Sequence, residues 1–221
     1  MKKIVLFVAA ALLVLFSQAA FAAENTGIYV GISGGYVIPA KLNLSNPNDG
    51  SWNNYDTTLN NGYLGGVKVG WNTPFTNRIL AVELEYNYIY HTFDKDKAVA
   101  SPSGATTFDG TVNIHAGFVN LKARYPEGRF HPYFGGGLGY SYVKIGDITT
   151  GQNNVIKGGS GGAFAYQFLA GLDFDITPNF GVGIGYKYLA SKPTIGSAGD
   201  AIYSVADYRA SIVTLGLTYT F

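Results

Sequence analysis

The sequence predicts an all-β protein, an eight-stranded antiparallel up-and-down transmembrane β-barrel with short periplasmic turns and long extracellular loops. Three observations predict this fold. Bulky apolar residues alternate with small or charged ones, short connections alternate with long ones, and aromatic residues gather toward both ends of the alternating segments. A period of two is typical of a strand whose two faces meet different surroundings.

The alternation divides the chain into eight segments. Each is long enough to cross a bilayer, because a tilted membrane strand needs only ~9–11 residues. Bacterial outer-membrane barrels have an even number of strands, and eight meets that condition. The predicted strands are residues 27–38, 62–72, 79–90, 111–125, 130–144, 163–176, 180–189 and 208–221.

The connections between the predicted strands are of two kinds. The short ones combine proline with asparagine or glycine, which favours tight turns, and lie at 73–77, 126–128 and 177–179. The long ones are rich in Gly, Ser, Thr, Asn and Asp, and lie at 39–61, 91–110, 145–162 and 190–207. Membrane barrels have short periplasmic turns and longer outer loops. Both chain termini are therefore expected in the periplasm.

The two rows of each strand differ in size. Bulky rows include Leu80, Val82, Leu84, Tyr86, Tyr88 and Tyr90, and also Phe164, Tyr166, Phe168, Ala170, Leu172 and Phe174. Small or charged rows include Gly135, Gly137, Gly139 and Ser141, and also Gly181, Gly183, Gly185 and Lys187. Because the interior of an eight-stranded barrel is narrow, the small rows are expected inside and the bulky rows against lipid. Aromatic belts at both strand ends are typical of the two membrane interfaces.

The segment 111–125 departs from this rule. Its even row is polar at Asn120, Lys122 and Arg124 but apolar over residues 112–118. A β-bulge near Gly117 would turn the apolar part outward. An apolar plug in the upper lumen would explain the same pattern, and the sequence does not distinguish the two.

The inward rows also carry charged side chains of both signs. These are Lys68, Glu83, Glu85, Lys122, Arg124, Asp173, Asp175 and Lys187. Charges in a narrow, low-dielectric lumen must be paired or hydrated, and counting back from the turn at 73–77 puts Lys68 opposite Glu83. The pairs would close the barrel as a polar core. Alternatively they form a salt-bridge gate, which Lys68→Ala or Glu83→Ala would open.

The amino terminus resembles a secretory signal peptide. Lys2 and Lys3 precede the apolar run 4–16, which is too short for a membrane-spanning helix, and Ala20-Phe21-Ala22 fits the cleavage pattern. We therefore expect a cleaved segment 1–22 and a barrel domain over 23–221. The chain has no cysteine, which excludes disulfides and thiolate metal sites. Its net charge of +1 gives no general attraction to nucleic acid.

No catalytic constellation is apparent. His91 and His115 are expected as polar residues near the loop-side interface, and His131 lies near a turn. No serine is expected beside His115 on its face, as a lipid hydrolase would need. Metal-ligand spacing and a nucleotide-binding glycine pattern are also missing. Asp94, Asp96 and Asp109 offer carboxylates to a divalent ion, but Asp94 and Asp96 alternate with Lys95 and Lys97, as is usual in a solvated loop. We expect no enzyme activity, cofactor or metal.

The carboxyl terminus is the most regular strand pattern. Residues 211–221 alternate without a break and end on Tyr219 and Phe221. This ending resembles the terminal signature of Gram-negative outer-membrane β-barrels, which their assembly machinery reads. With Ala20-Phe21-Ala22, AVELEYNY (81–88) and PYFGGGLGY (132–140), the mature chain resembles the OmpA/OmpX-type family of small eight-stranded outer-membrane proteins.

The resemblance implies an integral protein of the cell outer membrane with a structural or adhesin-like role. The implied partners are outer-membrane lipid or lipopolysaccharide, the assembly machinery, and an extracellular or host ligand. Contact with such a ligand would fall to loop residues, of which the candidates are Trp52, Tyr55, Ile202 and Tyr203. The alternatives are a narrow porin-like channel for ions or small solutes and, behind it, a lipid-modifying enzyme.

Overall fold

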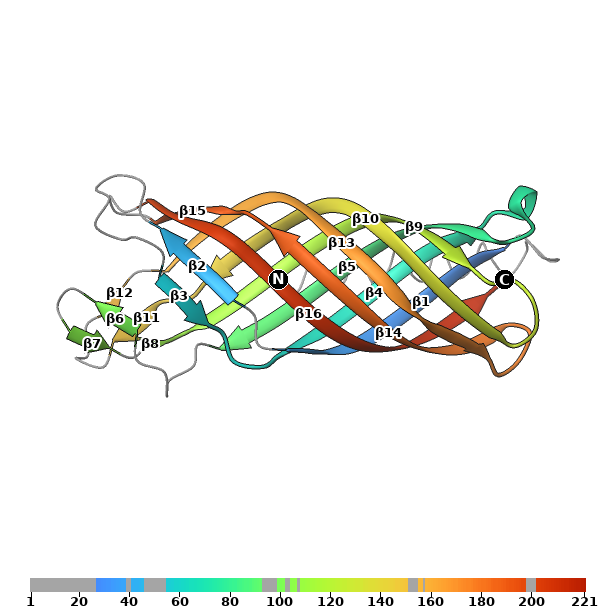
Figure 1. Ribbon diagram of the computed structural model, residues 1–221, viewed down its shortest axis with the longest axis horizontal. Helices are drawn as coiled ribbons and strands as arrows, with labels where there is room; N and C mark the ends of the chain where they lie inside the picture. The colour runs from blue at the N-terminus through green and yellow to red at the C-terminus, as the bar shows by residue number, and fades with distance from the viewer. Residues whose placement is uncertain are drawn as a thin grey trace, which may run out of the picture.

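Eight long antiparallel strands close into a tilted barrel in the computed structural model, which describes residues 27–38, 41–45, 55–92, 99–101, 104–106, 108–150, 155–156, 158–197 and 202–221 (Figure 1). Each strand pairs with the next along the chain, and pairing of the first with the last closes the ring. The barrel strands are β1 (Ile28–Val37), β4 (Gly62–Asn72), β5 (Leu80–Thr92), β9 (Thr111–Arg124), β10 (Phe130–Ile145), β13 (Gly159–Asp175), β14 (Phe180–Ser191) and β16 (Ile202–Thr220). The predicted fold class is confirmed.

Strand boundaries agree with the sequence except at one end of the barrel, called here the loop end. There β13 begins at Gly159 and β16 at Ile202, earlier than predicted. The reason is additional pairing, because β2 (Lys41–Ser45) pairs with β16, β15 (Thr194–Ser197) pairs with β13 and β16, and β3 (Tyr55–Thr58) pairs with β2. The sheet therefore continues into segments that the sequence suggested were only loop.

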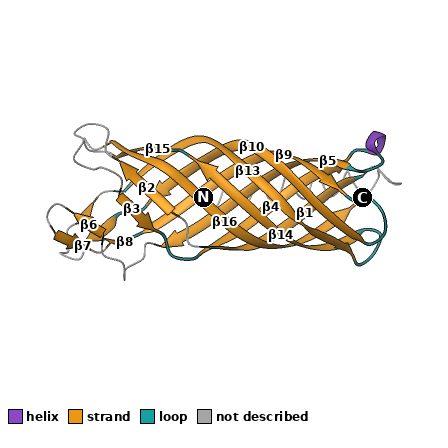
Figure 2. Ribbon diagram, in the orientation of Figure 1, coloured by secondary structure: helices purple, strands orange, loops and turns teal. Residues whose placement is uncertain are grey.

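Five further short strands lie at the loop end, opposite the end where the chain terminates (Figure 1). β6 (Val99–Ser101) pairs with β7 (Gly104–Thr106), and β11 (Ile148–Thr150) pairs with β8 (Phe108–Asp109) and β12 (Val155–Ile156). At the other end, called the turn end, the turn after β4 contains the 3₁₀ helix η1 (Pro74–Thr76), drawn purple in Figure 2. Within the described residues, no helix has the length and apolar character needed to cross a membrane.

The bulky rows face outward, as predicted. Leu84, Phe134 and Leu215 are 59%, 70% and 67% exposed, whereas their sequence neighbours on the inner rows are largely shielded. A soluble protein would bury side chains of this size. An outer surface that is mostly apolar instead fits immersion in lipid, as in outer-membrane barrels.

The structure of β9 decides between the β-bulge and the apolar plug that the sequence left open for residues 112–118. The strand pairs without a register shift with both β5 and β10, so there is no bulge at Gly117. Ile114 and Phe118 are 0% and 1% exposed and point into the barrel. The apolar plug is therefore the correct alternative. Its residues, the apolar floor, are Val37, Leu59, Leu64, Ile89, Val112, Ile114, Ala116, Phe118, Val143, Ile145, Ala165, Leu189, Tyr208, Ala210 and Ile212.

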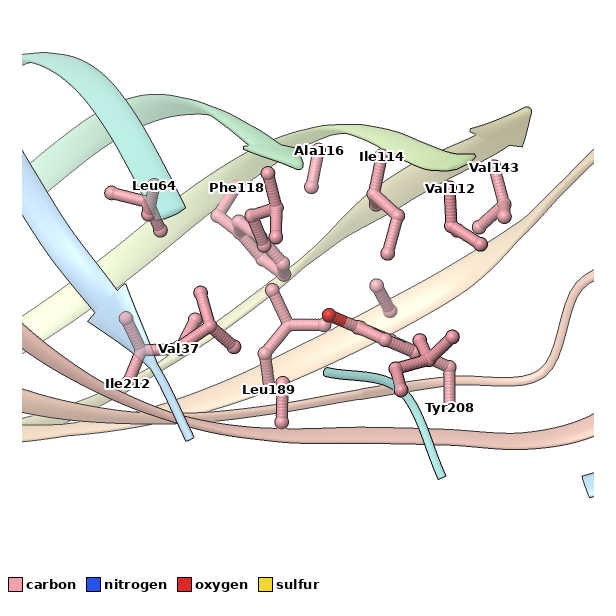
Figure 3. Packing of buried hydrophobic residues seen from close by; sticks show 14 of the residues in the cluster. Val37, Leu64, Val112, Ile114, Ala116, Phe118, Val143, Leu189, Tyr208 and Ile212 are labelled. Carbon is pink, nitrogen blue, oxygen red and sulfur yellow. The ribbon is translucent and has the colours of Figure 1, made fainter. Parts of the chain in front are cut away.

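The apolar floor fills the loop-end half of the lumen. Residues of β9 point across the interior toward Leu189 of β14 and Tyr208 of β16 on the facing wall (Figure 3). Dense packing of this kind leaves few voids as large as a water molecule. The core of this barrel thus has two layers, an apolar one toward the loop end and a polar one toward the turn end.

Candidate functional site

The polar layer of the core, toward the turn end, is a network of buried charges, called here the ionic floor. Its centre is formed by Glu83 and Glu85, which follow each other on the inner row of β5 and are each 3% exposed. Lys68 Nζ on β4 lies 3.5 Å from Glu83 Oε2. Lys122 Nζ on β9 lies 3.6 Å from the same oxygen and 3.8 Å from Asp173 Oδ2.

Glu85 has its own cation. Lys187 Nζ on β14 forms an ion pair with Glu85 Oε1 from the far side of the lumen. Gln167 and Asn120 donate to Glu85 Oε2 at 2.8 and 3.0 Å. These bonds connect the adjacent strands β5 and β9 with β13 and β14, which pair with each other elsewhere in the ring, so the ionic floor braces the barrel across its interior.

Neutral side chains complete the network around Glu83. Tyr29 OH on β1 donates to Glu83 Oε2 at 2.9 Å, and Asn120 Nδ2 donates to Oε1 at 3.1 Å. The ring of Tyr29 lies over Gly70, where any side chain would collide with it. Lys122 Nζ also lies 4.0 Å above the centroid of the Tyr133 ring, a cation–π contact. Because every carboxylate oxygen here has a donor, the buried charges are compensated.

The predicted pairing of Lys68 with Glu83 is correct as a contact but wrong in register. Lys68 stands opposite Glu85, and Gly70 stands opposite Glu83. The turn is longer than counted, because Thr73 N donates to Leu80 O and both Asn77 and Arg78 adopt positive φ angles of 53° and 62°. Lys68 therefore reaches Glu83 diagonally rather than directly.

The turn end of the lumen holds the remaining charges of the predicted set. Asp175 Oδ2 lies 2.8 Å from His131 Nε2, and His131 Nδ1 lies 2.8 Å from the carbonyl oxygen of Tyr125. Arg124 lines the same cavity as Asp173 and Asp175, and its Nε has no hydrogen-bond partner among the described residues. His131, placed near a turn by the sequence, thus belongs to the inner row and to this network.

Two small cavities lie within and below the ionic floor. Each has a volume of about 30 Å³. The lining of one includes Glu83, Glu85 and Lys187, that of the other includes Arg124 and Asp175, and Lys122 lines both. A water molecule needs roughly 10–15 Å³ on this measure. Each cavity therefore has room for two or three waters, enough to hydrate the charges.

His91 is not at the interface, contrary to the prediction. It is fully buried at the top of the inner row of β5, with Nε2 3.0 Å from Tyr208 OH and Nδ1 3.0 Å from the carbonyl oxygen of Asn60. The physical reason is parity, because β5 continues to Thr92 and His91 is in phase with Glu83 and Glu85. His91 is thus a buried polar residue at the loop-side boundary of the apolar floor.

His115 faces outward on β9. Its Nδ1 lies 2.7 Å from Tyr86 OH, and its ring centroid lies 5.1 Å from that of Tyr88. Among the described residues, His115 forms no hydrogen bond with a serine. In the described part of the chain, no group of His, Cys, Asp or Glu side chains is suited to hold a metal ion. Asp109 is exposed, and Asp94 and Asp96 lie outside the described residues.

Some predicted features lie outside the described residues. These are the segment 1–22, Trp52, and the side chains of Tyr55, Ile202 and Tyr203, whose backbones belong to β3 and β16. The carboxyl-terminal pair is described. The rings of Tyr219 and Phe221 are 5.0 Å apart at an edge-on angle, and Phe221 N donates to Ile28 O, which ties the chain end to β1.

The fold and the outward apolar rows define a transmembrane β-barrel. The chain belongs to the outer membrane protein beta-barrel domain family, whose model matches residues 8–221. A curated relative, an outer membrane protein of Gluconacetobacter diazotrophicus, is 29% identical over 205 residues, which cover 86% of this chain and 52% of the relative. The chain thus spans about half the length of that relative.

Solved structures show the same fold at low sequence identity. Neisserial surface protein A is 18% identical, with a TM-score of 0.51 over 90% of this chain and 100% of that one. The outer membrane protein AlkL is 18% identical, with a TM-score of 0.51 over 90% and 92% of the two chains. The outer membrane protease OmpT of Escherichia coli is 12% identical, with a TM-score of 0.51 over 91% and 99%. Their differing names indicate that the fold alone does not determine function.

Proposed function

We propose that this protein is a closed outer-membrane barrel with a structural and surface-contact role, neither an open pore nor an enzyme. One observation carries the proposal: the lumen is filled at two successive levels. The ionic floor connects strands across the interior through Glu83 and Glu85, and the apolar floor above it contains fully buried residues such as Phe118 and Ile114. A solute would have to break ion pairs and then pass an unhydrated layer.

The proposed orientation places the turn end in the periplasm and the loop end outside, after cleavage of the segment 1–22. In support, the first and last barrel strands meet at the turn end, where Phe221 N donates to Ile28 O. The proposed partners at this stage are the assembly machinery, which would read Tyr219 and Phe221, and the lipids of the outer membrane. At the loop end, β2, β3 and β15 extend the sheet beyond the closed ring (Figure 1) and offer a surface for an extracellular or host ligand.

The first prediction concerns conductance. The purified chain, folded into a planar lipid bilayer, is expected to show no reproducible single-channel steps, because both floors block the lumen. Insertion is verified independently by the shift in gel mobility of the unheated sample. Reproducible steps from the inserted protein would contradict the closed-barrel proposal and favour the narrow channel, whose path would run through the water-sized cavities beside Lys187 and Arg124.

The second prediction concerns surface contact. Deleting residues 51–58, which include Trp52, Tyr55 and β3, is expected to abolish binding of protein-displaying cells to immobilised matrix proteins and glycans. The barrel should stay folded, because β3 pairs outside the closed ring. A matched control replaces only Trp52 and Tyr55 with serine at constant chain length, and it should lose most of the binding if aromatic anchors carry it. Unchanged binding after the deletion would remove this part of the proposal.

A further inference from the structure

The outward face near the loop end carries a polar cluster amid the apolar rows. It consists of Asn113, His115, Tyr142, Lys144 and Ser160, called here the Lys144 patch. Lys144 on β10 stands directly opposite Asn113 on β9 and Ser160 on β13, and Tyr142 stands opposite His115. Adjacent and diagonal residues on one face of a sheet lie within about 8 Å of each other, so the five side chains form one continuous surface.

Among the described side chains, charge on the outward rows is sparse and of one sign. Among the described side chains of the barrel strands, the outward rows contain two formal charges, Lys144 and Arg209, both cationic and both toward the loop end. Lys144 is exposed and has no ion-pair partner among the described residues, and the nearby Asp147 accepts a bond from Gly158 N. A cation on a lipid-facing row is costly unless it meets an anion or water at the interface.

Hydrogen bonds with the surrounding tyrosines use part of the acceptor capacity of the patch. Tyr88 OH donates to Asn113 Oδ1 at 2.6 Å, and Tyr142 OH donates to Ser160 Oγ at 2.7 Å. Tyr86 OH lies 2.7 Å from His115 Nδ1, which leaves the ring proton on Nε2 if the hydroxyl donates. Asn113 Oδ1 and Ser160 Oγ thus each already accept one hydrogen bond from a tyrosine hydroxyl. The donors that the patch offers to a ligand are the Lys144 ammonium, the Asn113 amide and the Ser160 hydroxyl.

The surface below the patch is apolar. Tyr140 and Phe164 are 60% and 62% exposed on the same face. The ring of Tyr140 occupies the space beside Gly162, which has no side chain. A ligand that fits both the patch and the apolar surface below it has an anionic head group, which accepts several hydrogen bonds, and an apolar tail, which lies along the aromatic side chains. We propose that the Lys144 patch binds the phosphate group of an anionic lipid. The assignment does not depend on the closed lumen or on the loop-end contacts proposed above.

The third prediction tests this site with phosphatidic acid. The full chain in phosphatidylcholine nanodiscs is titrated with a fluorescent phosphatidic acid, and binding is measured by energy transfer from the protein. Lys144→Gln is expected to weaken binding about fivefold, the effect of one basic side chain at a membrane surface. Lys144→Arg should retain binding, and Arg209→Gln, which removes the other outward cation, should leave it unchanged.

Each contrary result overturns the proposal. Equal binding by Lys144→Gln and the unmodified protein would show that the patch takes no lipid phosphate. An equal loss in Arg209→Gln would indicate attraction by charge alone rather than a site. Displacement of the lipid by millimolar inorganic phosphate would show that a free anion, and not a lipid, is the ligand. Circular dichroism verifies folding of every variant, which the exposure of Lys144 leads us to expect.

Discussion

Replacing Lys187 with methionine is expected to lower the free energy of unfolding by about 3–5 kcal/mol, the usual cost of leaving a buried charge without its partner. Glu85 is 3% exposed, and Lys187 is the cation that contacts it within the described residues. Gln167 and Asn120 would still donate to its carboxylate, but neutral donors do not supply the lost charge. The measurement is a urea titration in lipid vesicles, followed by tryptophan fluorescence.

Two further variants separate this effect from a general loss of packing. The double variant Glu85→Gln with Lys187→Met is expected to recover most of the stability, because a neutral amide needs no cation. Lys68→Met should cost less than Lys187→Met, since Glu83 keeps Lys122 and the Tyr29 hydroxyl. A double variant no more stable than Lys187→Met would show that the cavity, and not the unpaired charge, causes the loss.

The sequence predicted the strands and their faces because both depend on local pattern. Leu84 and Phe168 were assigned to lipid from period-two alternation together with the bulk of their rows, which a narrow lumen would not hold, and their exposures of 59% and 60% agree. Register was harder to predict, since it depends on the backbone angles of a turn. The positive φ angles of Asn77 and Arg78 lengthen the turn and move Lys68 opposite Glu85. Asparagine is among the residues that favour a positive φ, but arginine is not, so the sequence indicates only the first of the two.

The candidate site was predictable in its charges and less so in its neutral members. Tyr29, Asn120 and Gln167 were missed, although each shares the inner row of its strand and parity could have identified them. His91 was misplaced because its strand was ended one residue too early. The choice between bulge and plug on β9 depended on pairing with two neighbouring strands, which a single sequence does not contain.

Opening the lumen is expected to require changes in both floors. The gate hypothesis, taken from the charges alone, expects Lys68→Ala or Glu83→Ala to raise conductance. The apolar floor changes this expectation, because Phe118 and Ile114 fill the lumen above those charges. Narrow apolar constrictions block ions by excluding water. We therefore expect Glu83→Ala alone to give a folded but silent barrel in a planar bilayer.

The decisive comparison uses Phe118→Ser, which removes the largest side chain contributed by β9 to the apolar floor and supplies a group that binds water. Alone, it should also be silent, because Glu85 and Lys187 still cross the lumen below. Combined with Glu85→Ala and Lys187→Ala, which remove the ion pair that crosses the lumen, it should give resolvable single-channel steps, provided that gel mobility shows a folded barrel. Conductance by Glu83→Ala alone would place the barrier in the ionic floor. Silence of the folded triple variant would show that these changes in the two floors do not open the lumen, which would contradict the expectation. The contributions of the two floors are therefore separable by experiment, because a barrier in one floor or in both predicts a different set of conducting variants.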